Sequence, residues 1–79
     1  MNVKVYVTLK KGVLDPQGKA IKNSLESLGF SEVMDVRLGK YLELKVEGNS
    51  KEAASKRVEE MSKKLLANTV IEDFRYEIE

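Results

Sequence analysis

Few side chains in this sequence could do covalent chemistry. The 79 residues include no histidine and no cysteine, so the usual general base near neutral pH and the strongest common nucleophile are both missing. Zinc and the softer metals lose their preferred ligands for the same reason, which leaves only carboxylate sites for magnesium or calcium. Most of the 13 acidic residues stand beside basic ones, as solvated ion pairs do. We therefore predict no catalytic residue and no bound cofactor or metal in this chain.

The five glycines do not form a phosphate-binding loop. They stand at positions 12, 18, 29, 39 and 48, which matches neither the dinucleotide fingerprint nor a Walker A motif. Turn formation is the ordinary role for the last three. Gly18 differs, because it falls in the first turn of a predicted helix, where glycine costs about 1 kcal/mol relative to alanine. Either another backbone approaches closely there or the penalty is tolerated.

Hydrophobic periodicity predicts the elements that would position these residues. Residues 3–9 alternate between apolar and polar, as a strand with one buried face does. Asp15 as N-cap and Pro16 as first helical residue predict a helix that closes at Gly29. Residues 34–38 and 42–46 alternate around Gly39-Lys40-Tyr41. They predict a hairpin with a three-residue loop, in which Arg37 faces Glu43.

The second half of the chain repeats this order. Asn49 is the predicted cap of a second helix, whose apolar stripe is formed by Ala54, Val58, Met61 and Leu65. Asn68 and Thr69 end that helix, and residues 73–78 alternate as a final strand. The order βαββαβ predicts an α+β fold of ferredoxin-like type, with a four-stranded antiparallel sheet and both helices on one face. Residues 1–79 would then form a single domain.

The predicted sheet has one uncovered face. Tyr6 and Thr8 lie on it, so we expect these two residues to take part in self-association. Tyr6 with nearby lysines also suggests an RNA-binding sheet, but the predicted strand at 42–46 lacks the aromatic residues of that module. The formal net charge of +1 gives no broad positive field, so neither nucleic acid nor a membrane surface is an expected partner. No stretch of about 18 apolar residues occurs, and we expect a soluble, cytoplasmic protein.

Three stretches of the sequence together resemble the PurS family. They are residues 5–10 running into residues 13–18, residues 35–41, and residues 65–73. Within them stand the motifs Leu14-Asp15-Pro16-Gln17-Gly18, Val36-Arg37-Leu38-Gly39-Lys40 and Ala67-Asn68-Thr69-Val70-Ile71-Glu72. Each motif is short, but the combination is specific and extends over nearly the whole chain.

The resemblance implies a role in de novo purine biosynthesis. PurS is the smallest subunit of phosphoribosylformylglycinamidine synthase, in which a glutaminase, PurQ, releases ammonia and a synthetase, PurL, consumes it with ATP and magnesium. The resemblance implies that this subunit is a non-catalytic scaffold. It further implies a homodimer, or a dimer of dimers, that docks on PurL and helps ammonia pass from PurQ. No cofactor is expected on this subunit itself.

The resembling stretches also contain polar residues that folding alone does not explain. Gln17, Arg37, Lys40 and Thr69 have no packing role that the sequence suggests, although an exposed pair with Glu43 is an alternative for Arg37. The predicted partner-binding residues are Asp15, Pro16, Gln17, Gly18, Arg37, Gly39, Lys40, Tyr41, Asn68 and Thr69. A rival reading is a regulatory module of the ACT type, which shares the βαββαβ order and whose amino-acid-binding loop Asp15 to Gly18 loosely matches.

Overall fold

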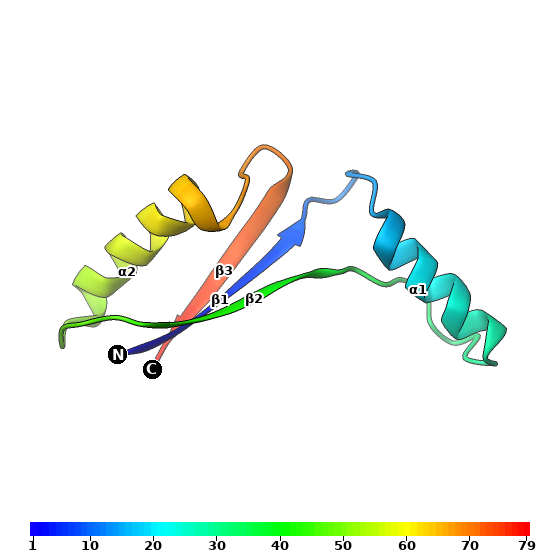
Figure 1. The fold of residues 1–79 in the computed structure, drawn as a ribbon, viewed down its shortest axis with the longest axis horizontal. Coiled ribbons are helices and arrows are strands. Elements are labelled where there is room, and N and C mark those ends of the chain that lie inside the picture. The colour runs from blue at the N-terminus through cyan, green and yellow to red at the C-terminus, as the bar shows by residue number, and fades with distance from the viewer.

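A three-stranded antiparallel sheet forms the centre of the molecule. The computed structural model describes all residues 1–79 (Figure 1). The elements are β1 (Asn2–Leu9), α1 (Pro16–Ser27), β2 (Gly39–Lys45), α2 (Lys51–Met61), the π-helical turn η1 (Ser62–Leu66) and β3 (Glu72–Ile78). The sheet order is β2-β1-β3. The predicted α+β class with two helices is confirmed. None of the helices has the length and hydrophobicity that a membrane-spanning helix needs.

The core lies where α2 covers one face of this sheet. Val3, Val5 and Val7 of the central strand are at most 1% exposed, and Val58 of α2 is fully buried against them. Ala67, just after η1, completes this small cluster. Only 8 of the 79 residues are buried, so one chain by itself encloses very little apolar volume.

The predicted hairpin is wrong. β2 begins at Gly39, which pairs with Thr8, so the Gly39-Lys40-Tyr41 segment starts a strand instead of forming a loop. Residues 31–38 form no strand. Because β2 runs antiparallel to β1, residues before Gly39 extend past the end of β1, where no strand is available to pair with them. The sheet therefore has three strands, and a single chain does not complete the ferredoxin-like layout.

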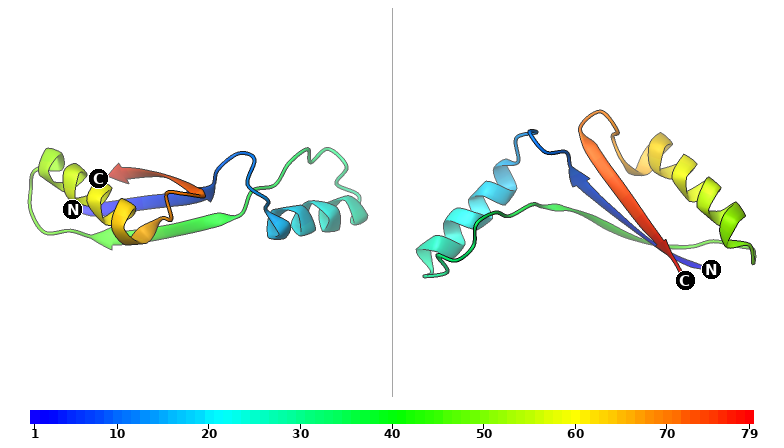
Figure 2. Two further views of the ribbon diagram at one scale, coloured as in Figure 1. Left: turned by 90° about the horizontal axis from the view of Figure 1, so that it is seen from above. Right: turned by 180° about the vertical axis from the view of Figure 1, so that it is seen from behind.

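The first helix has its predicted ends but not its predicted packing. Asp15 caps it, and Gly29 follows with φ of 97° in the left-handed region. However, α1 and the segment that returns from it project beyond the end of the sheet (Figures 1 and 2). We call residues 10–38 the arm. The molecule is consequently 48 × 25 × 14 Å, with a radius of gyration of 15.8 Å, where a compact 79-residue domain would have about 12 Å.

The second helix differs from the sequence prediction in its cap and in its apolar face. Ser50, not Asn49, is the N-cap, and its hydroxyl accepts a hydrogen bond from the Ala53 amide at 3.3 Å. The helix widens at η1, where the Ala67 amide donates to the Ser62 carbonyl five residues earlier at 2.8 Å.

This wide turn changes which side chains face the sheet. Leu65 is 82% exposed and Met61 is 36% exposed, whereas Ser62 is buried and Leu66 packs against the core. A regular helix would have turned Leu65 inward, as the 3.6-residue period predicts. Met61 still belongs to the regular helix, so the wide turn does not account for its exposure. The Ser62 hydroxyl is left without a hydrogen-bond partner.

Candidate partner-binding surfaces

The Asp15 carboxylate joins two of the predicted partner-binding segments. One oxygen accepts a hydrogen bond from the Gly18 amide at 2.9 Å, and the other accepts one from the Leu38 amide at 3.1 Å. These bonds, first that from Gly18 and then that from Leu38, lower the pKa of Asp15, and the Arg37 charge acts in the same direction. The ionised carboxylate therefore holds the start of α1 against the segment that leads into β2.

Gly18 is required at this junction by close packing. It is buried, and a Cβ atom placed on it would overlap the Val36 carbonyl oxygen and stand 2.6 Å from an Asp15 carboxylate oxygen. The close backbone approach considered from the sequence is thus confirmed. Because the contact is with main-chain atoms, no side-chain rotation relieves it.

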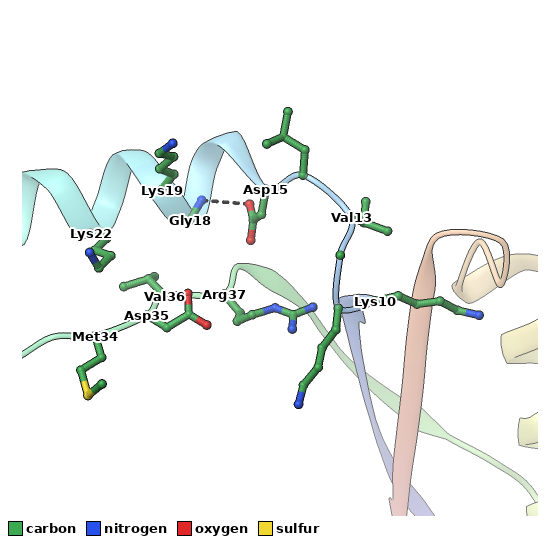
Figure 3. A pocket seen from close by; sticks show the side chains of 13 residues that line it. Lys10, Val13, Asp15, Gly18, Lys19, Lys22, Met34, Asp35, Val36 and Arg37 are labelled. Carbon is green, nitrogen blue, oxygen red and sulfur yellow. Dashed lines mark hydrogen bonds between the residues drawn. The ribbon is translucent and has the colours of Figure 1, made fainter.

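A cleft of about 600 Å³ opens beside this junction, between the end of β1, the start of α1 and the segment before β2 (Figure 3). Basic side chains surround it. They are Lys10, Lys11, Lys19, Lys22 and Arg37. Only Lys22 among them forms an ion pair, with Glu26 at 2.9 Å. We call this feature the cationic cleft.

The structure corrects the alternative considered for Arg37. It stands on the arm and not on the sheet, because the hairpin that would have placed it opposite Glu43 does not form. No ion pair joins those two residues. Arg37 is exposed and lines the cleft, so it stays among the predicted partner-binding residues.

Lys40 has a packing role that the sequence did not suggest. Its ammonium group donates to the Leu66 carbonyl at 3.1 Å and lies 4.0 Å from a Glu72 carboxylate oxygen. The same Glu72 carboxylate accepts the Asn68 amide at 2.7 Å, and the Asn68 side chain accepts the Val70 amide at 3.2 Å. Lys40 and Asn68 therefore fix the loop that precedes β3. Thr69 in this loop is exposed.

Tyr6, Tyr41 and Thr8 lie on the sheet face opposite α2, which we call the open face. The Tyr6 and Tyr41 rings are 5.2 Å apart, and the Arg75 guanidinium lies 4.0 Å from the Tyr6 ring centroid. Desolvation, and next a hydrogen bond with Glu43, raise the pKa of Tyr41. Thr8 is exposed, and its methyl group would be 2.8 Å from a Cβ on Gly39. The expected placement is confirmed, and a role in self-association stays a prediction.

The predicted partner-binding residues thus fall into three places. Asp15, Gly18 and Arg37 meet at the cationic cleft, with Pro16 and Gln17 exposed on the adjoining helix turn. Lys40 and Asn68 support the loop before β3, and Tyr41 points to the open face. The structure contains no cluster of three or more acidic, histidine or cysteine side chains able to hold a metal ion.

Sequence reasoning missed the lysines of the cleft. A signal was present, because Lys10 and Lys11 directly follow the first strand, while Lys19 and Lys22 are three apart and share one side of a helix. What the sequence does not show is that the arm folds these two groups around the same cleft as Arg37.

Comparison with known proteins gives matches over nearly the whole chain. The family model described as PurS, phosphoribosylformylglycinamidine (FGAM) synthase, matches residues 2–79. The phosphoribosylformylglycinamidine synthase subunit PurS of Bacillus subtilis (strain 168) is 57% identical over 77 residues, which cover 98% of this chain and 90% of that protein.

Two solved structures have the same fold as this chain. The first is Bacillus subtilis PurS, with a TM-score of 0.86 and 58% identity, covering 99% of this chain and 96% of that one. The second is a chain from the structure of PurLQS from Thermotoga maritima, with a TM-score of 0.85 and 32% identity, covering 98% and 96%.

Proposed function

The chain belongs to the PurS family of phosphoribosylformylglycinamidine synthase subunits, and from this premise we propose that it is a non-catalytic assembly subunit that binds a PurL synthetase and a PurQ glutaminase. The observation that carries the proposal is that the whole chain resembles a chain of the PurLQS structure, with 98% of it covered.

The scaffold role agrees with the chemistry of the residues. The chain has no histidine and no cysteine. On this proposal, glutamine hydrolysis belongs to the glutaminase, while ATP and magnesium are used by the synthetase. The small subunit then serves to hold the two catalytic proteins so that ammonia passes between them without loss to water. The family assignment also favours this role over the regulatory module of the ACT type.

The experiment separates assembly from catalysis. Synthesis of formylglycinamidine ribonucleotide is measured with PurL and PurQ of the same organism, with and without this chain, using either glutamine or free ammonium as nitrogen source. We expect the chain to be required with glutamine and dispensable with ammonium, because ammonium bypasses the transfer between subunits. Glutaminase or synthetase turnover by the pure chain, or glutamine-dependent synthesis that is indifferent to its presence, would contradict the proposal.

The same proposal includes self-association, which is supported by the surface of the single chain. A compact protein of 8.9 kDa exposes about 4,800 Å², whereas this chain exposes 6015 Å². The excess of about 1,200 Å² exceeds the roughly 800 Å² that each partner contributes to a standard interface. Three large apolar side chains of the arm are highly exposed, with Met34 at 90%, Leu14 at 77% and Leu28 at 73%.

The arm is the part of the chain that would meet a second copy. Residues 34–38 keep the alternation of a strand but have no strand to pair with, and the helix beside them buries little of its apolar side. On the sheet, Leu42, Leu44 and Val46 are only partly buried. If the arm of one copy packed against Leu42, Leu44 and Val46 of the other copy, the contact would cover the apolar surface of the arm and that of β2.

Self-association is tested by sedimentation at micromolar concentration, comparing Met34→Glu with Leu65→Glu. Both residues are highly exposed and apolar, but Leu65 lies on η1, outside the arm. We expect the wild type and Leu65→Glu to form dimers or larger oligomers and Met34→Glu to sediment as the 8.9 kDa monomer. Thr8→Glu examines the open face in the same way. A monomeric wild type would refute self-association, and dissociation by Thr8→Glu alone would move the interface to the open face.

A further inference from the structure

The cationic cleft contains most of the basic charge that the chain leaves unpaired. Seven of the 14 basic residues form ion pairs within the chain. Of the other seven, four line this cleft: Lys10, Lys11, Lys19 and Arg37. The net charge of +1 therefore conceals a local excess of positive charge at one end of the arm.

The two carboxylates of the cleft are already engaged with main-chain amides. Asp15 accepts hydrogen bonds from the Gly18 and Leu38 amides, and Asp35 accepts one from the Val36 amide at 3.0 Å. Neither carboxylate forms an ion pair within the chain. The lysine ammonium groups and the Arg37 guanidinium thus keep donors free for an external acidic group.

The arrangement of the cations suits an extended ligand more than a compact one. In Figure 3 the charged ends of Lys19, Lys22 and Arg37 point in different directions around the cleft and do not converge on one point. A single phosphate would contact few of them at once.

A second copy of the chain offers no long run of consecutive acidic residues. Its consecutive acidic residues are Glu59-Glu60 and Glu72-Asp73, and three of these four already form ion pairs within their own chain. A different protein is therefore the better source of an extended acidic segment.

We propose that the cationic cleft binds an extended acidic segment of another subunit of the synthase complex. This inference rests on the proposed function, because it assigns one contact within that assembly. Opposite charges across such a contact would accelerate association and fix the orientation of the subunit.

The test compares two double charge reversals that change the net charge equally. The cleft variant combines Lys11→Glu with Lys19→Glu and reverses two positive charges of the cleft. The α2 variant combines Lys51→Glu with Lys56→Glu and reverses two positive charges on the exposed side of α2, at residues that form no ion pair. Glutamate at position 19 lies in the first turns of α1, where a negative charge suits the helix dipole, so the cleft variant should fold. Affinity for PurL with PurQ is measured by titrating the labelled full chain, alongside circular dichroism and sedimentation of each variant.

We expect the cleft variant to bind the catalytic subunits about tenfold or more weakly, with self-association unchanged and the α2 variant close to wild type. Wild-type affinity should also fall more steeply than that of the cleft variant between about 50 and 300 mM salt. Equal losses in both variants, no loss in either, or loss of self-association in the cleft variant would each overturn the inference. A wild-type chain that does not assemble at all would instead refute the proposed function.

Discussion

Replacing Gly18 by alanine should destabilise the arm, although alanine is the better helix former. In an exposed helix interior the substitution would stabilise by about 1 kcal/mol. At position 18 the added Cβ overlaps the Val36 carbonyl oxygen and crowds the Asp15 carboxylate at 2.6 Å. Overpacking against atoms that cannot rotate away costs about 1–3 kcal/mol. The balance is a net loss of about 1 kcal/mol in the free energy that holds the arm together.

Native-state hydrogen exchange is the appropriate measurement, because the arm packs little against the sheet and we expect it to open independently of it. A loss of about 1 kcal/mol corresponds to about fivefold faster exchange of the α1 amides and of the Leu38 amide, which Asp15 protects. Exchange of the β1 amides should not change. Protein concentration is held constant between variants, since self-association alters the apparent stability.

Ser24→Ala is the matched control. Ser24 is exposed on the same helix, and its replacement should slow exchange of the α1 amides through helix propensity alone, by about 0.5 kcal/mol. If Gly18→Ala slows exchange as Ser24→Ala does, the backbone contact between α1 and Val36 does not exist in solution, and the junction described above is wrong.

Three further predictions follow from the core and the cap. Ser62→Ala should raise the free energy of unfolding by about 1 kcal/mol in urea titrations, because it removes a buried hydroxyl without a partner; destabilisation would mean that the hydroxyl is bonded. Val58→Ala should lower the free energy of unfolding by about 2 kcal/mol, and an unchanged urea midpoint would contradict the full burial of Val58. The Asp15 cap should persist below pH 3.8, the ordinary pKa, and be lost as pH falls through the lower folded value. Asp15→Asn should abolish this pH dependence of α1 helicity in circular dichroism, and an unaltered acid transition would refute it.

The local features of the chain could be predicted from the sequence. Strand β1, the beginning of α1 at Pro16, its end before Gly29 and the last strand all agree with the structure, because caps and short-range periodicity are set by neighbouring residues. The lack of histidine and cysteine is a property of the sequence itself. The same local reasoning gave close approach of another backbone as one of two explanations for Gly18.

Only the tertiary structure decided what each apolar surface meets. Residues 34–38 have the alternation of a strand, but a strand forms only where another strand supplies hydrogen bonds, and β1 ends before it reaches them. The wide turn at η1 leaves Leu65 exposed and packs Leu66 against the core, where a regular helix would have buried Leu65. Hydrophobic periodicity predicts which side of a helix or strand is apolar. It does not predict whether that side is covered by the same chain or by another. The cationic cleft was hidden for the same reason, since its charges come from segments that only the fold of the arm brings together.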